Sequence, residues 1–453
     1  MSAPARTDTA TGPLPRPLPA VTQGPLARLP PSAQDGLATG LSVLAVRRPA
    51  VPLVEVRLRV PAAGTASVPL GPATLLAETL LTGTARRSQV ELAADLQALG
   101  GALGTSVDAD RLSIGGSALA EHLGELLDLV AEILTGASYP EREVTGERTR
   151  LADRLAVARS QPGRRAREAL LGRLYGAHPY ARELPEVDEV TDATAEQVRA
   201  LHADRVRPDG AVLVLVGDLD PDAALQTVSE RLGGWAGTGV APPGVPAPLP
   251  SPALPALVVD RPGSVQTTIR LGGPAPQRWD PGYAAAKLAN LVFGGYFSSR
   301  LVANIRERRG YTYSPRSAID HGAAASLLTV AADVRTEVTA PAMVEIGYEL
   351  GLIATLPVPA EELDAARRYA VGALALSTAT QAGLASTLAA LAPVGLGLPF
   401  LAEHPRDLLA ATIEEVAVAA RGLLAPAGLS AVLLGDASAV AGDVAAVTPV
   451  ELA

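Results

Sequence analysis

The feature that most constrains the fold is an internal repeat. Residues 194–218 align without a gap to residues 412–436, at a fixed offset of 218 positions, and nine of the 25 aligned positions are identical. The identical residues of the first copy are Thr194, Glu196, Val198, Pro208, Gly210, Val214, Leu215, Gly217 and Asp218. Each copy has the pattern of a short helix, a proline turn and an apolar strand. The repeat therefore predicts two related domains of roughly 200 residues each.

The pattern within the first half predicts an α+β fold. Residues 53–60 alternate apolar and charged side chains, which is typical of a strand with one solvated face. Ser88 and Glu91 have capping-box spacing ahead of an apolar stripe, so a helix is expected to start there. Further helices are expected from the apolar stripe at 123–134 and after Pro140. Strands followed by runs of helices favour two homologous α/β-sandwich domains, each an antiparallel or mixed sheet packed by helices.

Proline-rich segments mark the expected domain boundaries. Residues 1–35 contain many prolines and no continuous apolar stretch, so we expect a flexible tail and no secretory signal. Residues 237–256 form a second Pro/Gly-rich run and are expected to link domains at 36–236 and 257–453. No apolar run reaches the ~18–20 residues of a membrane span, and we expect a cytoplasmic protein.

Composition excludes several classes of function. The formal net charge of −9 argues against nucleic acid or an anionic membrane as a partner, since both require a basic face. The chain has no cysteine, which excludes disulfides, thiolate metal sites and cysteine nucleophiles. None of the five histidines lies three or four positions from another, so no helical pair of histidine metal ligands exists.

Three stretches together carry a resemblance to a known family. They are GPATLLAETLLTGT at 71–84, GAHPYAR at 176–182 followed by VLVLVGD at 212–218, and FGGYFSSRLVANIRERRGYTYSPRS at 293–317. In this order, and with the internal repeat, residues 36–445 resemble the pitrilysin/insulinase-like zinc peptidases, whose metal motif is HxxEH. The resemblance implies two homologous α+β domains in a chain of this size, and two such chains that enclose a chamber for unfolded peptides.

The chain departs from the family at the metal motif. Thr74 stands where the first zinc histidine is expected, Ala77 where the glutamate base is expected, and Glu78 where the second histidine is expected. The downstream glutamate ligand is expected near Glu147 or Arg148. A catalytic zinc needs three protein ligands and a water, and an alanine cannot take a proton from that water. We therefore expect no metal or other cofactor in this chain and no peptide hydrolysis by the chain alone.

The third stretch matches the family's substrate-contacting pair. The resemblance implies that an arginine and a tyrosine seven positions apart reach the scissile peptide, and Arg306 and Tyr313 have that spacing and context. A guanidinium can hold a substrate carbonyl or carboxylate, and a phenol can stabilise an oxyanion. From spacing alone, an arginine favourable at a helix C-terminus and a tyrosine packed in a strand remain an open alternative. We expect the helix to end at Gly310 and a strand to start within residues 311–314.

These observations lead to one hypothesis and two alternatives. The leading hypothesis is the zinc-free, substrate-binding subunit of a heterodimeric peptidase that cleaves extended peptides. Its partner is then a homologous chain that carries HxxEH and the zinc, and Arg306 and Tyr313 act on it in trans. One alternative is a non-catalytic structural or assembly protein of the same fold, and another is a homodimeric peptide-binding module. The sequence does not identify the peptide, and leader-peptide removal and general peptide turnover both stay open.

Overall fold

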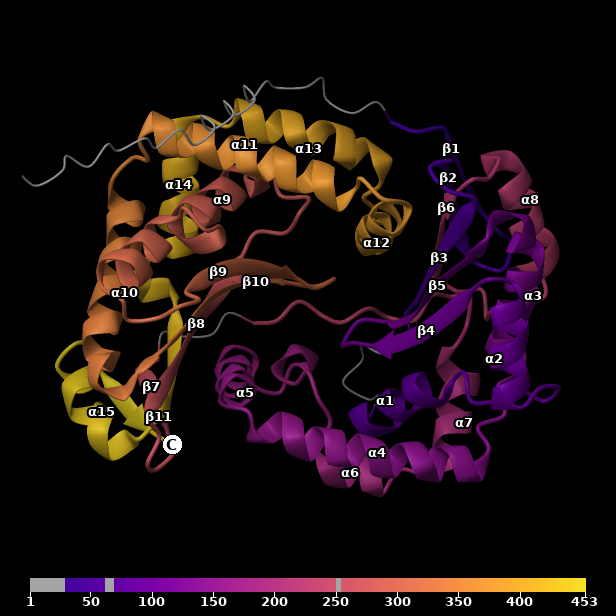
Figure 1. The fold of residues 1–453 in the computed structure, drawn as a ribbon, viewed down its shortest axis with the longest axis horizontal. Coiled ribbons are helices and arrows are strands. Elements are labelled where there is room, and N and C mark those ends of the chain that lie inside the picture. The colour runs from indigo at the N-terminus through magenta and orange to yellow at the C-terminus, as the bar shows by residue number, and fades with distance from the viewer. Residues whose placement is uncertain (1–28, 62–68, 250–253) are drawn as a thin grey trace, which may run out of the picture.

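A computed structural model describes residues 29–61, 69–249 and 254–453. It consists of two halves that face each other, each built on one six-stranded sheet (Figure 1). The first sheet has the order β1 (Ser32–Gly36), β2 (Ser42–Arg47), β6 (Val212–Gly217), β3 (Leu53–Val60), β5 (Leu112–Leu119) and β4 (Ala102–Val107). Only the β2–β6 pair is parallel within this sheet.

The second sheet repeats this plan. Its order is β12 (Val450–Leu452), β7 (Ala256–Asp260), β11 (Ser430–Gly435), β8 (Gln266–Ala275), β10 (Ser326–Arg335) and β9 (Arg316–His321). The parallel pairs here are β7–β11 and β12–β7. The two sheets differ at one edge, because β1 pairs antiparallel with β2 whereas β12 pairs parallel with β7. The predicted α+β class and the two homologous mixed-sheet domains are confirmed.

The helices are divided between the two halves. The first half contains α1 (Leu70–Thr79), α2 (Gln89–Ala98), α3 (Leu123–Gly136), α4 (Glu141–Ser160), α5 (Pro162–Tyr175), α6 (Val187–Thr191), α7 (Ala195–Arg205) and α8 (Pro221–Leu232), with the 3₁₀ turns η1 (Ala120–His122) and η2 (Pro179–Ala181). The second half contains α9 (Tyr283–Asn290), α10 (Thr339–Thr355), α11 (Ala360–Ser377), α12 (Gln381–Leu391), α13 (Leu398–Ala410), α14 (Ile413–Leu424) and α15 (Ala437–Ala445). Its shorter segments are the π-helical η3 (Leu291–Gly295) and η4 (Val302–Arg308) and the 3₁₀ turns η5 (Thr336–Val338), η6 (Ala392–Val394) and η7 (Pro426–Gly428).

Helix caps follow the sequence pattern. Ser88 and Glu91 form the expected capping box at the start of α2. Thr194 and Thr412, which are equivalent in the repeat, each form a capping box at the start of α7 and α14. A capping box satisfies two backbone N–H groups that the first helical turn leaves without partners. The repeat is therefore preserved at the level of single hydrogen bonds.

One helix of each half packs against the sheet of the other half. Ala166 and Leu170 on α5 pack against Val432 and Leu434 on β11 of the second sheet. In the same way, a row of buried residues on α12 packs against β2 and β6 of the first sheet. Figure 1 shows α5 beside the second sheet and α12 beside the first. Each sheet is therefore covered on one face by its own helices and on the other by a helix of the opposite half.

This exchange corrects the predicted solvated face of residues 53–60. Glu55 is only 9% exposed, and Arg57 bonds to Glu55 at 2.8 Å beneath α12. The side chain of Gln381, at the start of α12, donates to the carbonyl oxygens of Arg48 and Val51 at 2.7 and 3.0 Å. The alternating charges thus mark an interface between the halves and not a water-facing surface.

The predicted boundaries need one change. β1 begins at Ser32 and pairs with β2, so residues 32–35 belong to the first sheet and not to the tail. Residues 1–28 lie outside the described part of the chain, as do residues 250–253 of the expected linker. Residues 237–249 form no helix or strand.

Within the described ranges, no single helix is long and apolar enough to cross a membrane. The two helices Ala360–Ser377 and Gln381–Val394 together have the length and apolar composition of a span, but they meet at a bend of 108°.

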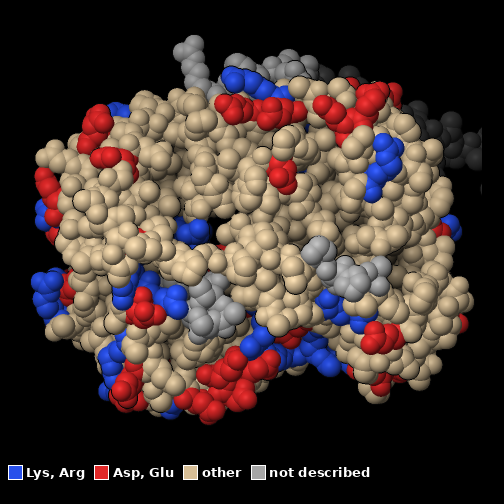
Figure 2. Space-filling view, turned by 180° about the vertical axis from the view of Figure 1, so that it is seen from behind, with Lys and Arg blue, Asp and Glu red and all other residues tan. Residues whose placement is uncertain are grey.

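The surface charge of one face is mixed. On the face shown in Figure 2, basic side chains lie mostly next to acidic ones. That face therefore has the mixed charge of an ordinary protein surface.

Candidate functional site

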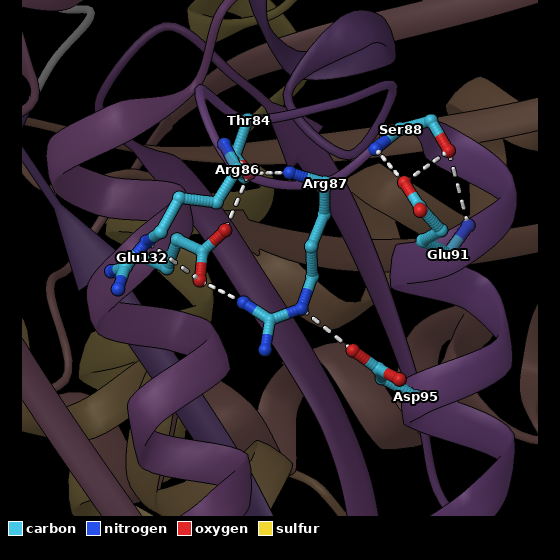
Figure 3. Close-up of polar contacts among 7 residues, drawn as sticks. All are labelled: Thr84, Arg86, Arg87, Ser88, Glu91, Asp95 and Glu132. Atoms are coloured by element: carbon cyan, nitrogen blue, oxygen red, sulfur yellow. Dashed lines mark hydrogen bonds and ion pairs between the residues drawn. The ribbon is translucent and has the colours of Figure 1, made fainter.

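The helix that carries the degenerate metal motif is held in place at both ends. At its start, a Cβ atom added to Gly71 would lie 2.3 Å from the carbonyl oxygen of Glu189, so only glycine fits against this backbone. After its end, the Thr84 hydroxyl donates to the carboxylate of Glu132 and accepts the backbone N–H of Arg87 at 2.9 Å (Figure 3). The first and last residues of the 71–84 stretch therefore have structural roles.

Glu132 is the centre of the cluster drawn in Figure 3. It lies on α3, is 5% exposed, and accepts a hydrogen bond from the Arg87 guanidinium, which also bonds to Asp95 on α2 at 2.6 Å. Burial alone would raise the pKa of Glu132, but the hydrogen bonds from Thr84 and Arg87 outweigh burial and lower that pKa below its ordinary value. The cluster ties α2, α3 and the end of the motif together through one charged carboxylate.

The three positions of the degenerate motif make contacts that suit a structural helix. The Thr74 hydroxyl donates to the carbonyl oxygen of Leu70 at 2.8 Å, one turn back in α1. Ala77 is buried, and its carbonyl oxygen accepts the Thr105 hydroxyl of the edge strand β4 at 2.6 Å. Glu78 pairs with Arg154 on α4, with 3.0 Å between Oε2 and Nη2.

Arg154 is the residue that the sequence interpretation missed. Its Nη2 also lies 2.7 Å from Glu147 Oε1, so one guanidinium bridges Glu78 and the buried Glu147. Burial alone would lower the pKa of Arg154, but the hydrogen bond to Glu147 and the charge of Glu78 outweigh it and raise that pKa. Glu147 and Arg154 are two helical turns apart and share a face of α4, a signal that was available in the sequence.

The residues at this position do not fit zinc. The two groups that stand in for the histidines are a hydroxyl bonded within its own helix and a carboxylate paired with an arginine. A cationic guanidinium is already 3.0 Å from that carboxylate, and a metal dication would be repelled by it. Across the described ranges, no group of three or more His, Cys, Asp or Glu side chains has a metal-binding arrangement. Arg148, named as an alternative position for the downstream ligand, instead donates to the carbonyl oxygen of Ala193 at 3.1 Å.

Arg306 and Tyr313 lie in the second half, on the segment around Gly310. Arg306 is on η4, and its guanidinium carbon lies 4.7 Å from the centre of the Phe297 ring. Its Nε is 3.3 Å from Glu307 Oε1, and the side chain is 35% exposed. Gly310 has φ +63°, in agreement with the expected left-handed end of the helix. Tyr313 is 88% exposed.

The expected strand does not begin at residues 311–314. β9 starts at Arg316, so Tyr313 lies in the loop before it. Pro315 explains why the strand starts later than expected, because proline has no N–H to donate to a sheet and restricts the conformation of the residue before it. The alternative of a tyrosine packed in a strand is wrong, since the Tyr313 side chain is almost fully exposed.

The two sets of predicted site residues do not meet within one chain. Thr74, Ala77 and Glu78 belong to the first half, whereas Arg306 and Tyr313 belong to the second. Among the described residues, no hydrogen bond, ion pair or ring contact joins the two sets. The chain therefore has a helix without metal ligands in one half, and a partly exposed Arg306 and an exposed Tyr313 in the other.

Comparison with known families agrees with this arrangement. Residues 64–186 match the family described as Insulinase (Peptidase family M16), and residues 192–369 match the one described as Peptidase M16 inactive domain. Two homologous α+β halves with a metal helix that has lost its ligands define the class as an insulinase-type peptidase fold without a metal site. The chain belongs to the insulinase family, peptidase family M16.

Individual relatives include proteins named as uncharacterised zinc proteases and one named as a probable inactive metalloprotease. An uncharacterised zinc protease of Mycobacterium tuberculosis is 29% identical over 361 residues, which cover 78% of this chain and 81% of that protein. A probable inactive metalloprotease of Bacillus subtilis is 26% identical over 207 residues, or 43% of this chain and 47% of that protein.

Solved structures share the whole fold. The crystal structure of a peptidase M16 inactive domain from Pseudomonas fluorescens has a TM-score of 0.81 at 26% identity, covering 89% of this chain and 98% of that chain. A protease from Helicobacter pylori also has a TM-score of 0.81, covering 90% of this chain and 100% of that one, and at 18% identity it shows the fold alone.

Proposed function

We propose that this chain is the zinc-free subunit of a two-chain peptidase that cleaves extended peptides. In this proposal a homologous chain carries HxxEH and zinc, and the present chain supplies Arg306 and Tyr313 to that site. The observation that carries the proposal is the contrast between the two halves. The metal position is filled by the Glu78–Arg154–Glu147 bridge, whereas Tyr313 is 88% exposed and has its hydroxyl available to another molecule.

The chemistry of the pair suits a contribution in trans. The Phe297 ring lies against the Arg306 guanidinium at 4.7 Å and restricts its motion, while the partly exposed side chain still presents N–H donors. A guanidinium so placed can hold a peptide carbonyl, and a phenol hydroxyl can donate to the oxygen that becomes negative during hydrolysis. Such a donor contributes about 3–4 kcal/mol in the transition state.

Two sheet edges offer a place for the peptide backbone. β4 and β9 are the edge strands nearest the junction of the halves, and each pairs with a strand on one side only within the described residues. An extended peptide can add a strand to such an edge, so that main-chain hydrogen bonds give affinity with little sequence preference. This supports peptides as the substrate class.

The test is reconstitution with an HxxEH-bearing homologue from the same genome. Neither chain alone should cleave a peptide library, and the mixture should. Tyr313→Phe should lower kcat and kcat/KM together by about 10²-fold, as for other lost oxyanion donors. Arg306→Lys should mainly raise KM, because it keeps the charge but loses the planar fork. Tyr348→Phe, the same change at another exposed tyrosine, is the matched control.

Full activity of both site variants in a complex that still co-elutes would overturn the catalytic role. In that case the structural or assembly role becomes the better account of the chain.

A further inference from the structure

A small cavity lies where the two halves meet. Its volume is about 160 Å³, and it is enclosed by equivalent parts of the repeat together with the end of α12. The β4–β5 hairpin contributes residues 108, 110 and 111, the β9–β10 hairpin contributes 321–323, and the loop after β8 contributes 277–279. The cavity is thus formed only when the two hairpin tips come together.

The acidic groups of this cavity are already engaged by the hairpins. Asp110 Oδ1 accepts the Tyr180 hydroxyl at 2.7 Å, and its Oδ2 accepts the backbone N–H of Ala323 at 2.9 Å. Asp108 Oδ1 accepts the N–H groups of Asp110 and Arg111, both at 2.8 Å. Both carboxylates therefore hold the hairpin tips, and neither forms an ion pair with an arginine of the cavity.

Three arginines line the cavity, and the charges of Asp108 and Asp110 act on two of them, Arg59 and Arg111, without a direct ion pair. Within the described residues, Arg59, Arg111 and Arg278 form no ion pair at 4.0 Å or less. Arg59 donates to the Ser113 hydroxyl, and Arg111 donates to the carbonyl oxygen of Pro393 at 3.3 Å. Burial lowers the pKa of both Arg59 and Arg111, but a guanidinium remains charged at neutral pH.

A second layer behind the cavity adds positive charge. Lys287, the single lysine of the chain, is half-buried on α9, and burial followed by the charge of Arg278 lowers its pKa. Burial, then Arg278 and Lys287, lower the pKa of His321 to about 3, so this imidazole is neutral. His404 is 3% exposed, and its Nε2 is buried without a hydrogen-bond partner. Burial, then Lys287 and Arg278, lower the pKa of His404 to about 3, so this imidazole is also neutral.

We propose that this cavity binds a carboxylate, the C-terminal carboxylate of an extended peptide. Guanidinium groups recognise carboxylates through paired, charge-assisted hydrogen bonds. Three of them line this cavity against the two carboxylates of Asp108 and Asp110, so positive charge is in excess. The volume is below the ~300–1,000 Å³ of typical small-molecule sites, so the cavity holds a chain end and not a whole ligand. The inference rests on the proposed function in taking a peptide as the ligand.

The sheet edges set the direction of such a peptide. β4 ends at Val107, directly before Asp108 of the cavity, and β9 ends at His321 in its wall. A peptide paired parallel to either edge strand would run toward the cavity and end in it with its carboxyl group. The opposite direction would bring an ammonium group to three arginines, which is electrostatically unfavourable.

The experiment compares two forms of one peptide on the purified full-length chain. The probes are a fluorescent, N-acetylated Ala-Ser repeat decapeptide with a free C-terminal carboxylate and the same peptide as its amide, measured by anisotropy. The free acid should bind about tenfold or more tightly than the amide, as expected for a charge-assisted contact. Arg278→Gln and Arg111→Gln should each remove most of this difference, and Arg421→Gln, at an exposed site on α14, should leave it unchanged.

Competition with inorganic phosphate tests whether the cavity selects a peptide carboxylate or binds another small anion equally well. Displacement of the free acid by millimolar phosphate, with no effect on residual amide binding, supports a carboxylate held by charge. Phosphate binding without any preference for the free acid would overturn the assignment to a peptide end, and so would the absence of binding by either peptide.

Failure of this site and failure of the proposed function are distinguishable. If Tyr313→Phe abolishes activity in the reconstituted pair while acid and amide bind alike, only the cavity assignment is wrong. If the acid preference holds while Tyr313→Phe stays fully active, the cavity stands and the catalytic role in trans is wrong.

Discussion

Restoring the metal motif should require removal of Arg154 as well as replacement of the motif residues. The triple variant Thr74→His, Ala77→Glu, Glu78→His reinstates HxxEH on α1 but leaves the Arg154 guanidinium, which now lies 3.0 Å from the Glu78 carboxylate. A unit charge and a dication about 4 Å apart repel by about 4 kcal/mol at an effective dielectric near 40, between the protein value of about 20 and that of water. We therefore expect zinc to bind about 10³-fold more weakly to the triple variant than to the same variant with Arg154→Gln.

Removal of Arg154 should also raise the zinc affinity by a second route, through Glu147. Arg154 holds Glu147 Oε1 at 2.7 Å, and its removal frees one oxygen of that buried carboxylate for a metal. Arg150→Gln is the matched control, because Arg150 bonds to the same carboxylate at 2.7 Å and has no contact with Glu78. Zinc affinity is measured by competition with a chromophoric chelator, and circular dichroism confirms that each variant is folded. Equal zinc affinity with and without Arg154→Gln would refute the reasoning, as would an equal gain from Arg150→Gln.

Three further predictions concern stability. Glu132→Gln should lower the free energy of unfolding by about 2 kcal/mol near pH 7, the scale of a charged hydrogen bond. Because the folded carboxyl has a pKa below its ordinary value of 4.5, this contribution is present above pH 4.5 and is lost as the pH falls through the lowered pKa. Urea unfolding at pH 7 and at low pH checks it, and an unchanged difference would contradict it. Gly71→Ala should lower the melting temperature through a loss of about 1–3 kcal/mol, because the new Cβ meets the Glu189 carbonyl at 2.3 Å. Leu388→Ala, on α12, should cost about 2–5 kcal/mol and speed proteolysis between the halves, whereas exposed Leu376→Ala should do neither.

The repeat and the local elements could be predicted because their signals are local. The capping box at Ser88 needs two residues three positions apart, and the stripe at 123–134 needs one helix face. The exchanged helices could not be predicted, because the strands that α12 covers, β2 and β6, are both more than 160 residues away from it in the sequence. This is why the charges at Glu55 and Arg57 were interpreted as a solvated face and are in fact buried under α12.

In the candidate site, too, residue type could be interpreted from the sequence, whereas contacts that depend on packing could not. Thr74 and Ala77 could be identified as unsuitable zinc ligands from residue type alone, whereas a glutamate can bind zinc and Glu78 is instead paired with Arg154 in the structure. The role of Arg154 depends on the packing of α4 against α1, and the sequence interpretation therefore placed the downstream position at Glu147 or Arg148. Only one of these, Glu147, faces the motif.

The Glu78–Arg154–Glu147 bridge also explains how the fold persists without a metal. In a zinc site the metal neutralises the acidic ligands and ties two helices together. Here Glu78 on α1 and the buried Glu147 on α4 would repel each other if they stood alone, and Glu147 would be costly to bury as a charge. Arg154 provides one positive charge, which pairs with Glu147 within α4 and with Glu78 on α1, so one contact still joins the two helices while the metal's Lewis acidity is absent. A chain built in this way keeps the shape of a peptidase half but cannot activate water there. This is the basis of the proposal that a second chain supplies the zinc chemistry and that this chain supplies Arg306 and Tyr313.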